Sequence, residues 1–155
     1  MHFICSPTRA LVIYSQLSTL SPRWSPSLVY EPIPSACEPA ELDPLRQLLP
    51  HLAIFSPNHE EAGSFFSVSA ETINAQGRFG VEELARRFLE EGAGGAVVIR
   101  SGPMGAYAIS KGQRKGVWVD AWYNYGDEAV KDVTGAGNSF LVSLDRAGLC
   151  VRGED

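Results

Sequence analysis

Apolar residues along the chain alternate between a helical and an extended spacing. Spacings of three and four positions predict helices over Arg9–Leu20, from Pro44 to about Pro50, and over Asn58–Phe66, Val81–Glu91 and Ala136–Ala147. Short apolar runs predict strands over Leu28–Tyr30, His51–Phe55, Ala96–Ile99, Ala106–Ile109 and Gly116–Val119, and Val130–Val133 leads into the last helix. This alternation of helices and strands predicts an α/β fold.

The clearest helix is Val81–Glu91, in which Leu84 and Phe88 share one face and charged residues cover the other. Gly92 follows and ends the helix. The next apolar run, Ala96–Ile99, has no polar residue at alternate positions. Such a run is typical of a strand in a parallel sheet that is covered on both faces.

Length and charge exclude one class of function. The 155 residues, of which 45% are hydrophobic, are enough for one domain with its own core. The net charge is −5, from 13 Lys and Arg against 18 Asp and Glu, and no basic patch stands out. We therefore expect no binding to nucleic acid, which requires many cations to neutralise phosphates.

No signal in the sequence indicates a membrane or a secreted protein. The apolar runs are far shorter than the ~20 residues that span a bilayer, and the first residues lack the pattern of a signal peptide. Cys5, Cys37 and Cys150 are far apart, without the C-x-x-C spacing of a zinc site, and their odd number gives no disulfide framework. We expect a cytoplasmic protein that binds no membrane.

The most informative segment is residues 132–140, which read Asp-Val-Thr-Gly-Ala-Gly-Asn-Ser-Phe. Glycines at the start of a helix leave backbone N–H groups open to an anion, which the helix dipole also attracts. Close packing of the helix on a neighbouring strand explains the same glycines. The segment is not a Walker A loop, because no Lys-Ser or Lys-Thr follows, and the third glycine of a dinucleotide fingerprint is absent.

This segment resembles the C-terminal signature of the PfkB, or ribokinase-like, carbohydrate kinases. The resemblance implies an anion hole for the transferring phosphoryl group at Gly135, Ala136 and Gly137. In the family, the residue that follows is the Asp that takes the proton of the substrate hydroxyl. Here Asn138 stands in its place, and an amide cannot accept that proton. The positions of this segment that the resemblance assigns to nucleotide and phosphate binding are Asp132 and Thr134.

Two further segments match the family in the expected order, and the first follows a predicted strand with the spacing Asn58-x-x-Glu61. By itself this spacing is typical of a helix capping box. By resemblance the motif lies near magnesium and phosphate, which implies that Asn58 and Glu61 organise Mg²⁺ through water. The two interpretations are compatible, because a cap places polar atoms at the carboxyl edge of the sheet, where ligands bind.

The second segment, residues 100–105, resembles the family's Thr-Leu-Gly-x-x-Gly, which touches the nucleotide phosphates. Gly102 and Gly105 match, but Arg100 replaces the usual Thr. Two glycines at this spacing also form ordinary β-turns. The sequence leaves open whether Arg100 holds phosphate through a forked contact, fills the pocket or points to solvent. The aromatic residues that follow are expected to serve packing more than nucleotide binding: Trp118, Trp122, Tyr123 and Tyr125.

The resemblance covers about residues 9–148 and implies one partial domain over 1–155. The expected fold is a ribokinase-like three-layer α/β sandwich with a mostly parallel sheet. We expect it to lack the family's N-terminal half, which carries the β lid and most sugar contacts, and the family's C-terminal end. A sheet without its neighbouring strands exposes an edge and apolar surface. We therefore expect a protein partner that covers this edge.

Two functions from different classes remain open. The resemblance implies ATP-dependent phosphoryl transfer to a sugar-like alcohol, with ATP and Mg²⁺ as cofactors, impaired here by Asn138 and by the missing substrate half. The alternative is a non-catalytic pseudokinase or scaffold that acts through protein interactions. Residues 24–39, residues 56–61 and the Gly-Asn of the signature look most like the fungal maintenance-of-killer branch of the family, which favours this alternative.

Overall fold

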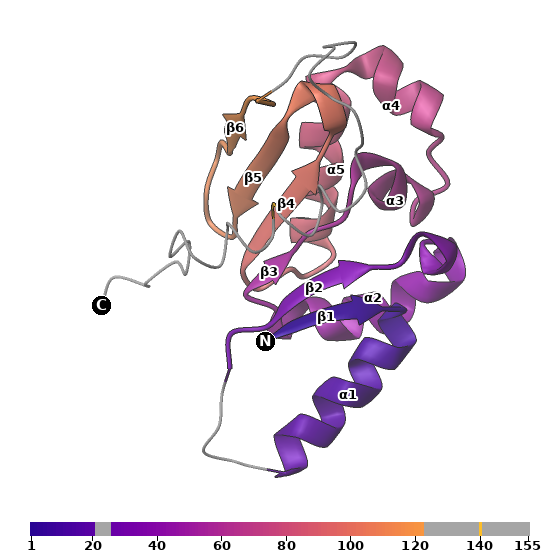
Figure 1. Ribbon diagram of the computed structural model, residues 1–155, viewed down its shortest axis with the longest axis vertical. Coiled ribbons are helices and arrows are strands. Elements are labelled where there is room, and N and C mark those ends of the chain that lie inside the picture. Colours follow the sequence, from indigo (N-terminus) through magenta and orange to yellow (C-terminus); the bar gives the residue numbers. More distant parts are fainter. Residues whose placement is uncertain (21–25, 123–139, 141–155) are drawn as a thin grey trace.

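The computed structural model describes residues 1–20, 26–122 and 140, and its central feature is a six-stranded sheet (Figure 1). The strands are β1 (His2–Cys5), β2 (Val29–Pro32), β3 (Ile54–Phe55), β4 (Ala96–Arg100), β5 (Ala106–Ser110) and β6 (Val117–Val119). They lie side by side in chain order. The pairs from β1 to β4 are parallel, whereas β5 and β6 are each antiparallel to the preceding strand.

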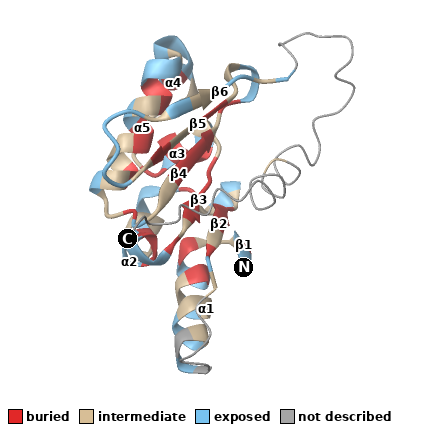
Figure 2. Ribbon diagram, turned by 90° about the vertical axis from the view of Figure 1, so that its left-hand side faces the viewer, coloured by how far each residue is buried: buried red, intermediate tan, exposed pale blue. Residues whose placement is uncertain are grey.

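Helices connect the parallel strands, as the α/β pattern predicts. They are α1 (Pro7–Leu20), α2 (Leu42–Leu48), α3 (His59–Ser64), α4 (Ala70–Gln76) and α5 (Arg78–Glu90). Short 3₁₀ turns cover Pro34–Ala36, Pro39–Glu41, Leu49–His51 and Gly102–Met104. α1 packs on α2, and α5 packs on β4 and β5. Figure 2 shows the buried residues concentrated in the strands and on parts of the helices.

The core is continuous from the sheet into the helices. Phe88 of α5 is fully buried and meets the ring of Phe55 in β3 edge-on, with ring centres 4.8 Å apart. Phe65 and Phe66 also contact Phe88. Edge-to-face aromatic packing of this kind adds about 0.5–1.5 kcal/mol per pair beyond area burial. The apolar face predicted for this helix therefore anchors it to the sheet.

The elements predicted within the described residues are found, with shifted ends. The helix expected over Val81–Glu91 begins three residues earlier, at Arg78, and ends at Glu90. The strand expected from His51 begins only at Ile54, because His51 closes a 3₁₀ turn. The strand expected to stop at Tyr30 continues to Pro32, its last residue, where the missing proline N–H interrupts no later pairing.

Two elements were not predicted. β1 has a single fully buried residue, Phe3, and so gives a weak pattern. α4 buries only Ile73, and its other apolar residues are small alanines, so it gives no apolar face that the sequence reveals. The strand predicted at Ala96–Ile99 is parallel to β3 on one side and antiparallel to β5 on the other. The sheet is mostly parallel, as expected. The elements predicted over 130–133 and 136–147 lie outside the described residues.

In the part of the chain that the structure describes, no helix combines the length and the apolar character needed to cross a membrane.

Candidate functional site

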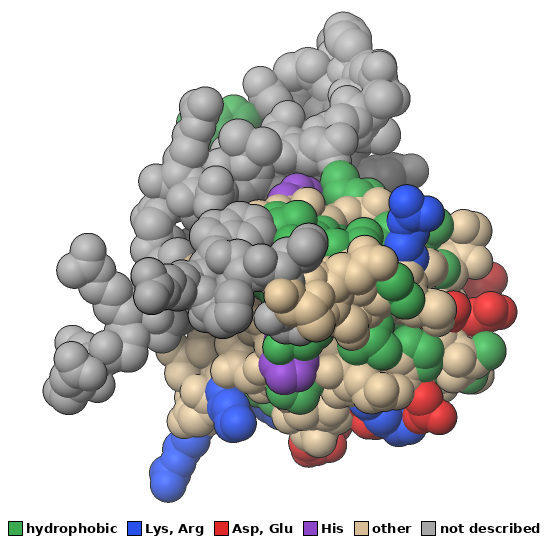
Figure 3. Space-filling model, turned by 90° about the horizontal axis from the view of Figure 1, so that it is seen from below, with side chains coloured by type: hydrophobic (Ala, Val, Ile, Leu, Met, Phe, Trp, Pro, Cys, Tyr) green, Lys and Arg blue, Asp and Glu red, His purple; other side chains and the backbone are tan. Residues whose placement is uncertain are grey.

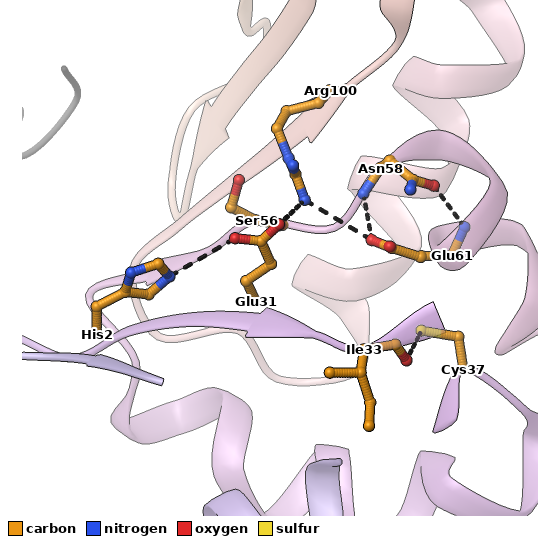
Figure 4. Close-up of polar contacts among 8 residues, drawn as sticks. All are labelled: His2, Glu31, Ile33, Cys37, Ser56, Asn58, Glu61 and Arg100. Atoms are coloured by element: carbon orange, nitrogen blue, oxygen red, sulfur yellow. Dashed lines mark hydrogen bonds and ion pairs between the residues drawn. The ribbon is translucent and has the colours of Figure 1, made fainter. Parts of the chain in front are cut away.

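Polar side chains collect where β2, β3 and β4 end (Figure 4). Glu31 lies in β2, Ser56 follows β3, and Arg100 is the last residue of β4. Because these strands are parallel neighbours, their carboxyl ends meet at one edge of the sheet. Among the described residues, the buried polar and charged ones all lie at this edge: Glu31, Ser56, Glu61 and Ser101.

A capping box opens α3 at this edge. Asn58 is the N-cap, and its side-chain Oδ1 accepts a hydrogen bond from the Glu61 N–H at 2.8 Å. In return, the Glu61 carboxylate accepts from the Asn58 N–H at 2.7 Å. Asn58 also forms a parallel bridge with Arg100, which ties the cap to the end of β4. The predicted cap is therefore confirmed, and it stands beside the strand end that carries the glycine turn.

Arg100 lies between two carboxylates instead of pointing to solvent. Its Nη2 is 2.6 Å from Glu31 Oε1 and 3.7 Å from Glu61 Oε2, and it donates to the Ser56 carbonyl at 3.1 Å. The Arg100 side chain is only 16% exposed. Of the three alternatives for Arg100, the structure therefore excludes the solvent-directed one.

Among the described residues, the site carries more negative than positive charge. Glu31 and Glu61 are both buried, and Arg100 is the guanidinium that pairs with them. Burial raises the pKa of the Glu61 carboxyl, while the Asn58 N–H and the charge of Arg100 oppose that rise. His2 Nε2 approaches the other oxygen of Glu31 at 3.7 Å. Within the part of the chain that the structure describes, two carboxylates thus share one permanent cation in a place with little water.

Several polar atoms at this edge are buried without a hydrogen-bond partner in the described chain. They are Glu31 Oε2, Ser56 Oγ, His59 Nδ1, Arg100 Nε and Ser101 Oγ. Buried polar atoms normally have a partner, because an unpaired one costs about 1–3 kcal/mol. An ordered water, an ion or a polar ligand can supply partners to these atoms.

A pocket of about 410 Å³ adjoins this group of residues. Arg100, Gly102 and Gly105 line one part of it, and Trp122 and Phe140 line another. The three residues of the glycine turn that were predicted to approach phosphate therefore share one cavity. Phe140, the last residue of the glycine signature, belongs to the same lining.

The backbone conformation of the turn also explains why it contains glycines. Gly105 has φ of 93°, and a Cβ there would stand 2.1 Å from the carbonyl oxygen of Val119. Gly102 has φ of 51° but open space around it. The turn brings Ser101 N–H to the Gly105 carbonyl at 2.8 Å. The ordinary-turn interpretation of Gly-x-x-Gly is therefore correct, and the pocket it borders is compatible with the phosphate interpretation.

The two tryptophans that follow the glycine turn, Trp118 and Trp122, differ in their surroundings. Trp118 packs on Tyr107, and its indole N–H donates to Glu82 at 2.9 Å, so it serves packing as expected. Trp122 is 90% exposed and lines the pocket, which contradicts the expectation of packing for that residue. Tyr123 and Tyr125 lie outside the described residues.

The structure thus brings the predicted site residues Asn58, Glu61, Arg100, Gly102 and Gly105 to one edge of the sheet. The remaining ones lie outside the described residues: Asp132, Thr134, Gly135, Ala136, Gly137 and Asn138. Sequence reasoning did not single out Glu31 or Ser56. A signal was available for Glu31, because it is a charged residue placed directly after a predicted buried strand.

The donor set fits a Mg²⁺ ion held through water. No group of three or more His, Cys, Asp or Glu side chains could hold a metal directly within residues 1–20 and 26–122. A Mg²⁺ ion needs fewer protein ligands than that, because it usually keeps several waters and binds one or two carboxylates together with substrate phosphates. The contacts of the Glu61 carboxylate with described residues all use Oε2, which leaves Oε1 available. The amide oxygen of Asn58 is occupied by the cap.

Comparison with known structures identifies the fold. The chain superposes on ribokinase from Cryptococcus neoformans var. grubii serotype A in complex with ADP with a TM-score of 0.70 at 20% identity, over 95% of this chain and 48% of the other. Adenosine kinase from Anopheles gambiae in complex with P1,P4-di(adenosine-5) tetraphosphate gives 0.61 at 18% identity, over 94% and 45%. Ribokinase from Giardia lamblia gives 0.60 at 20% identity, over 93% and 40%.

These likenesses show a ribokinase-like α/β fold, and the chain spans less than half the length of each of these structures. No curated protein sequence matches the chain. In contrast, the sequence model of the pfkB family carbohydrate kinases matches residues 25–146, which is most of the chain. The match includes the strand ends, the capping box, the glycine turn and the glycine signature. The chain therefore belongs to the PfkB family of carbohydrate kinases.

Proposed function

We propose that this chain is the nucleotide-binding part of a PfkB-type kinase and that it binds ATP and ADP with Mg²⁺. The observation that carries the proposal is the pocket, in which Arg100, Gly102 and Gly105 share one lining with Phe140 of the glycine signature. Glu61 lies beside this pocket, within 3.7 Å of Arg100. Similarity to a ribokinase that was crystallised with ADP supports the same assignment.

The residues have distinct roles in this proposal. Gly102 and Gly105 allow the chain to approach the phosphates closely, and Asp132 and Thr134 complete the phosphate-binding set. Gly135, Ala136 and Gly137 offer backbone N–H groups to the transferring phosphoryl group, where preorganised donors are most effective. Glu61 holds Mg²⁺ through water, with Asn58 fixing the Glu61 backbone. The bound ion neutralises charge on the nucleotide phosphates.

The ancestral reaction in this proposal is phosphoryl transfer from ATP to a sugar-like alcohol. A correctly placed base contributes typically 10²–10⁴-fold to such a step. Asn138 keeps the shape of the family's Asp but cannot accept the hydroxyl proton. The anion hole consists of backbone and does not depend on that carboxylate. We therefore propose that nucleotide binding outlasts catalysis in this chain.

Asn138 also favours the second candidate function. A chain without its base is free to act as a non-catalytic scaffold of the fungal maintenance-of-killer type, through a partner that covers the edge of the sheet. In this case the nucleotide site is either a regulatory element or a remnant. Cys5 and Cys37 are free thiols, which supports the cytoplasmic location proposed for either function.

Thermal unfolding with and without Mg-ADP separates the two candidates. We expect stabilisation, because a ligand that binds only the folded state adds about 2.7 kcal/mol at one hundred times its Kd. Glu61→Gln should lose the part of this stabilisation that depends on Mg²⁺. Glu90→Gln, at an exposed carboxylate near the end of α5, is the matched control and should behave like the wild type.

A wild-type chain that Mg-ADP and Mg-ATP leave unchanged would rule out the nucleotide site and favour the scaffold. Turnover is assayed in parallel with ribose, fructose and adenosine. We expect none above a heat-killed sample, since phosphoryl transfer depends on positioning of the acceptor and Asn138 supplies no base.

A further inference from the structure

The guanidinium of Arg100 pairs unequally with the two carboxylates beside it (Figure 4). Nη2 is 2.6 Å from Glu31 Oε1 but 3.7 Å from Glu61 Oε2. The Ser56 carbonyl accepts from the same nitrogen at 3.1 Å. Arg100 therefore pairs mainly with Glu31, and its contact with Glu61 is the longer and weaker of the two.

Besides Arg100, the Glu31 carboxylate is approached in the described chain only by His2, whose Nε2 lies 3.7 Å from Oε2. The Glu31 side chain is 11% exposed, it takes no part in the capping box, and its Oε2 has no hydrogen-bond partner in the described chain. Burying a carboxylate is costly unless it is paired. The family's usual Thr at the Arg100 position would need no such pair. Glu31 and Arg100 therefore form one unit that this chain has and the resemblance does not explain.

Without Glu31, Arg100 has one carboxylate of the described chain left within 4 Å, that of Glu61. Attraction between unit charges rises as they approach and as water is excluded. The guanidinium would need to move by only about 1 Å to reach the ideal N···O separation of an ion pair with Glu61. Glu61 would then be neutralised by a side chain and would attract a divalent cation much less.

We infer that Glu31 is a positioning residue: it holds Arg100 away from Glu61, so that the Glu61 carboxylate keeps its charge and its free oxygen for Mg²⁺. The inference rests on the proposed function, because it concerns the ion that accompanies the nucleotide. This role adds Glu31 of β2 to the site. It also gives a partner to Arg100, which stands where the family usually has Thr.

The test measures the Kd of ADP by calorimetry, with Mg²⁺ and with EDTA, and uses the ratio of the two as the readout. In Glu31→Gln we expect the gain from Mg²⁺ to fall by about fivefold or more, the effect of one close charge at a partly buried site. Affinity in EDTA should stay level or rise, since the released guanidinium adds positive charge near the phosphates. The double variant Glu31→Gln/Arg100→Met should restore the wild-type ratio, because it removes the guanidinium that would neutralise Glu61.

Two further variants separate position from net charge. Glu31→Asp keeps the charge but shortens the side chain, so we expect a smaller fall of the ratio in the same direction. Glu91→Gln removes a carboxylate that is paired with Arg46, away from the site, and should leave the ratio unchanged. Far-UV circular dichroism confirms that each variant is folded. If Glu31→Gln does not fold, Glu31→Asp decides the question.

An unchanged ratio in Glu31→Gln, or a double variant that fails to restore it, would overturn the inference while the proposed function stands. A fall in Glu31→Gln with no change in Glu31→Asp would assign the effect to net charge and overturn the positioning role. If the wild type binds ADP under neither condition, the proposed function fails and this inference fails with it.

Discussion

At the scale of single residues, burial decides what the polar groups beside the pocket can do. Arg100 and its two carboxylates depend on one another, since removing one partner of a buried ion pair leaves an uncompensated charge. The same burial acts on the neighbouring thiol of Cys37, which donates to the carbonyl of Ile33 at 3.3 Å. Burial raises the pKa of Cys37 to about 12, and the charge of Glu61 adds to the rise.

Cys37 should therefore be unreactive in the folded protein. We expect iodoacetamide at pH 8 to leave Cys37 unmodified until urea unfolds the chain, because the thiolate is the reactive form. Mass spectrometry of the peptide that contains Cys37 measures the modification. Fast labelling of Cys37 under native conditions would contradict the buried position.

The same shift makes stability depend on alkaline pH. The folded pKa of Cys37 lies above its ordinary value of 9.0, so the folded state binds a proton more tightly between pH 9 and about 12. The stability that the Cys37 thiol contributes to the folded state is fully present below pH 9 and is lost as the pH rises from 9 to about 12. Burial also raises the pKa of Cys5 and of Tyr30, so Cys37→Ala should reduce the slope without abolishing it.

At the scale of elements, tight turns place the strand ends that form the pocket. The turn between β4 and β5 positions Gly102 and Gly105, and β6 passes close enough to exclude a side chain at one of them. The start of α3 is fixed in a comparable way by the mutual hydrogen bonds of Asn58 and Glu61. These local devices hold the site in place without using the apolar core.

Alanine at the two glycines should have unequal effects. Gly102→Ala meets only a left-handed backbone and should cost about 1–2 kcal/mol of unfolding free energy. Gly105→Ala adds a Cβ at 2.1 Å from the Val119 carbonyl and must move the backbone, so it should cost about 3 kcal/mol or more. Urea unfolding measures both. Equal costs would show that β6 does not restrict Gly105.

At the scale of the whole molecule, β1 forms one edge of the sheet among the strands that the structure describes. β1 pairs only with β2 among the described strands, and Ile4 of β1 is 52% exposed. Figure 3 shows hydrophobic side chains spread among other residues on the described part of the face seen from below, with charged side chains of both signs at its margins. An edge strand with exposed apolar residues favours pairing with another chain. This arrangement supports the proposed protein partner at the β1 edge.

Charge at this edge should therefore reduce association. We expect the isolated chain to self-associate as its concentration rises, and Ile4→Lys to weaken that association while changing stability by no more than about 0.5 kcal/mol. Val12→Lys, at an equally exposed residue of α1, is the matched control. Size-exclusion chromatography with light scattering measures the mass. If both variants act equally, general hydrophobicity drives the association instead of strand pairing.

Individual residues show which elements of the fold could be predicted from the sequence and which could not. The pattern around Leu84 and Phe88 predicted α5, because a helix with one strongly apolar face can be recognised from its own spacing. α4 buries only Ile73 and could not be predicted in this way, since its position depends on its neighbours α3 and α5. The strand predicted over His51–Phe55 was too long. β3 covers only Ile54 and Phe55, because His51 belongs to the preceding 3₁₀ turn.

The sequence by itself determined the α/β class, the cap of Asn58 and Glu61 and the glycine turn, because each depends on residues that are neighbours along the chain. Only the tertiary structure decided that Arg100 pairs with Glu31. These residues stand on β2 and β4, with β3 between them, and no local spacing relates them. Strand order places their side chains at one edge, and the exclusion of water there forces the charges to pair.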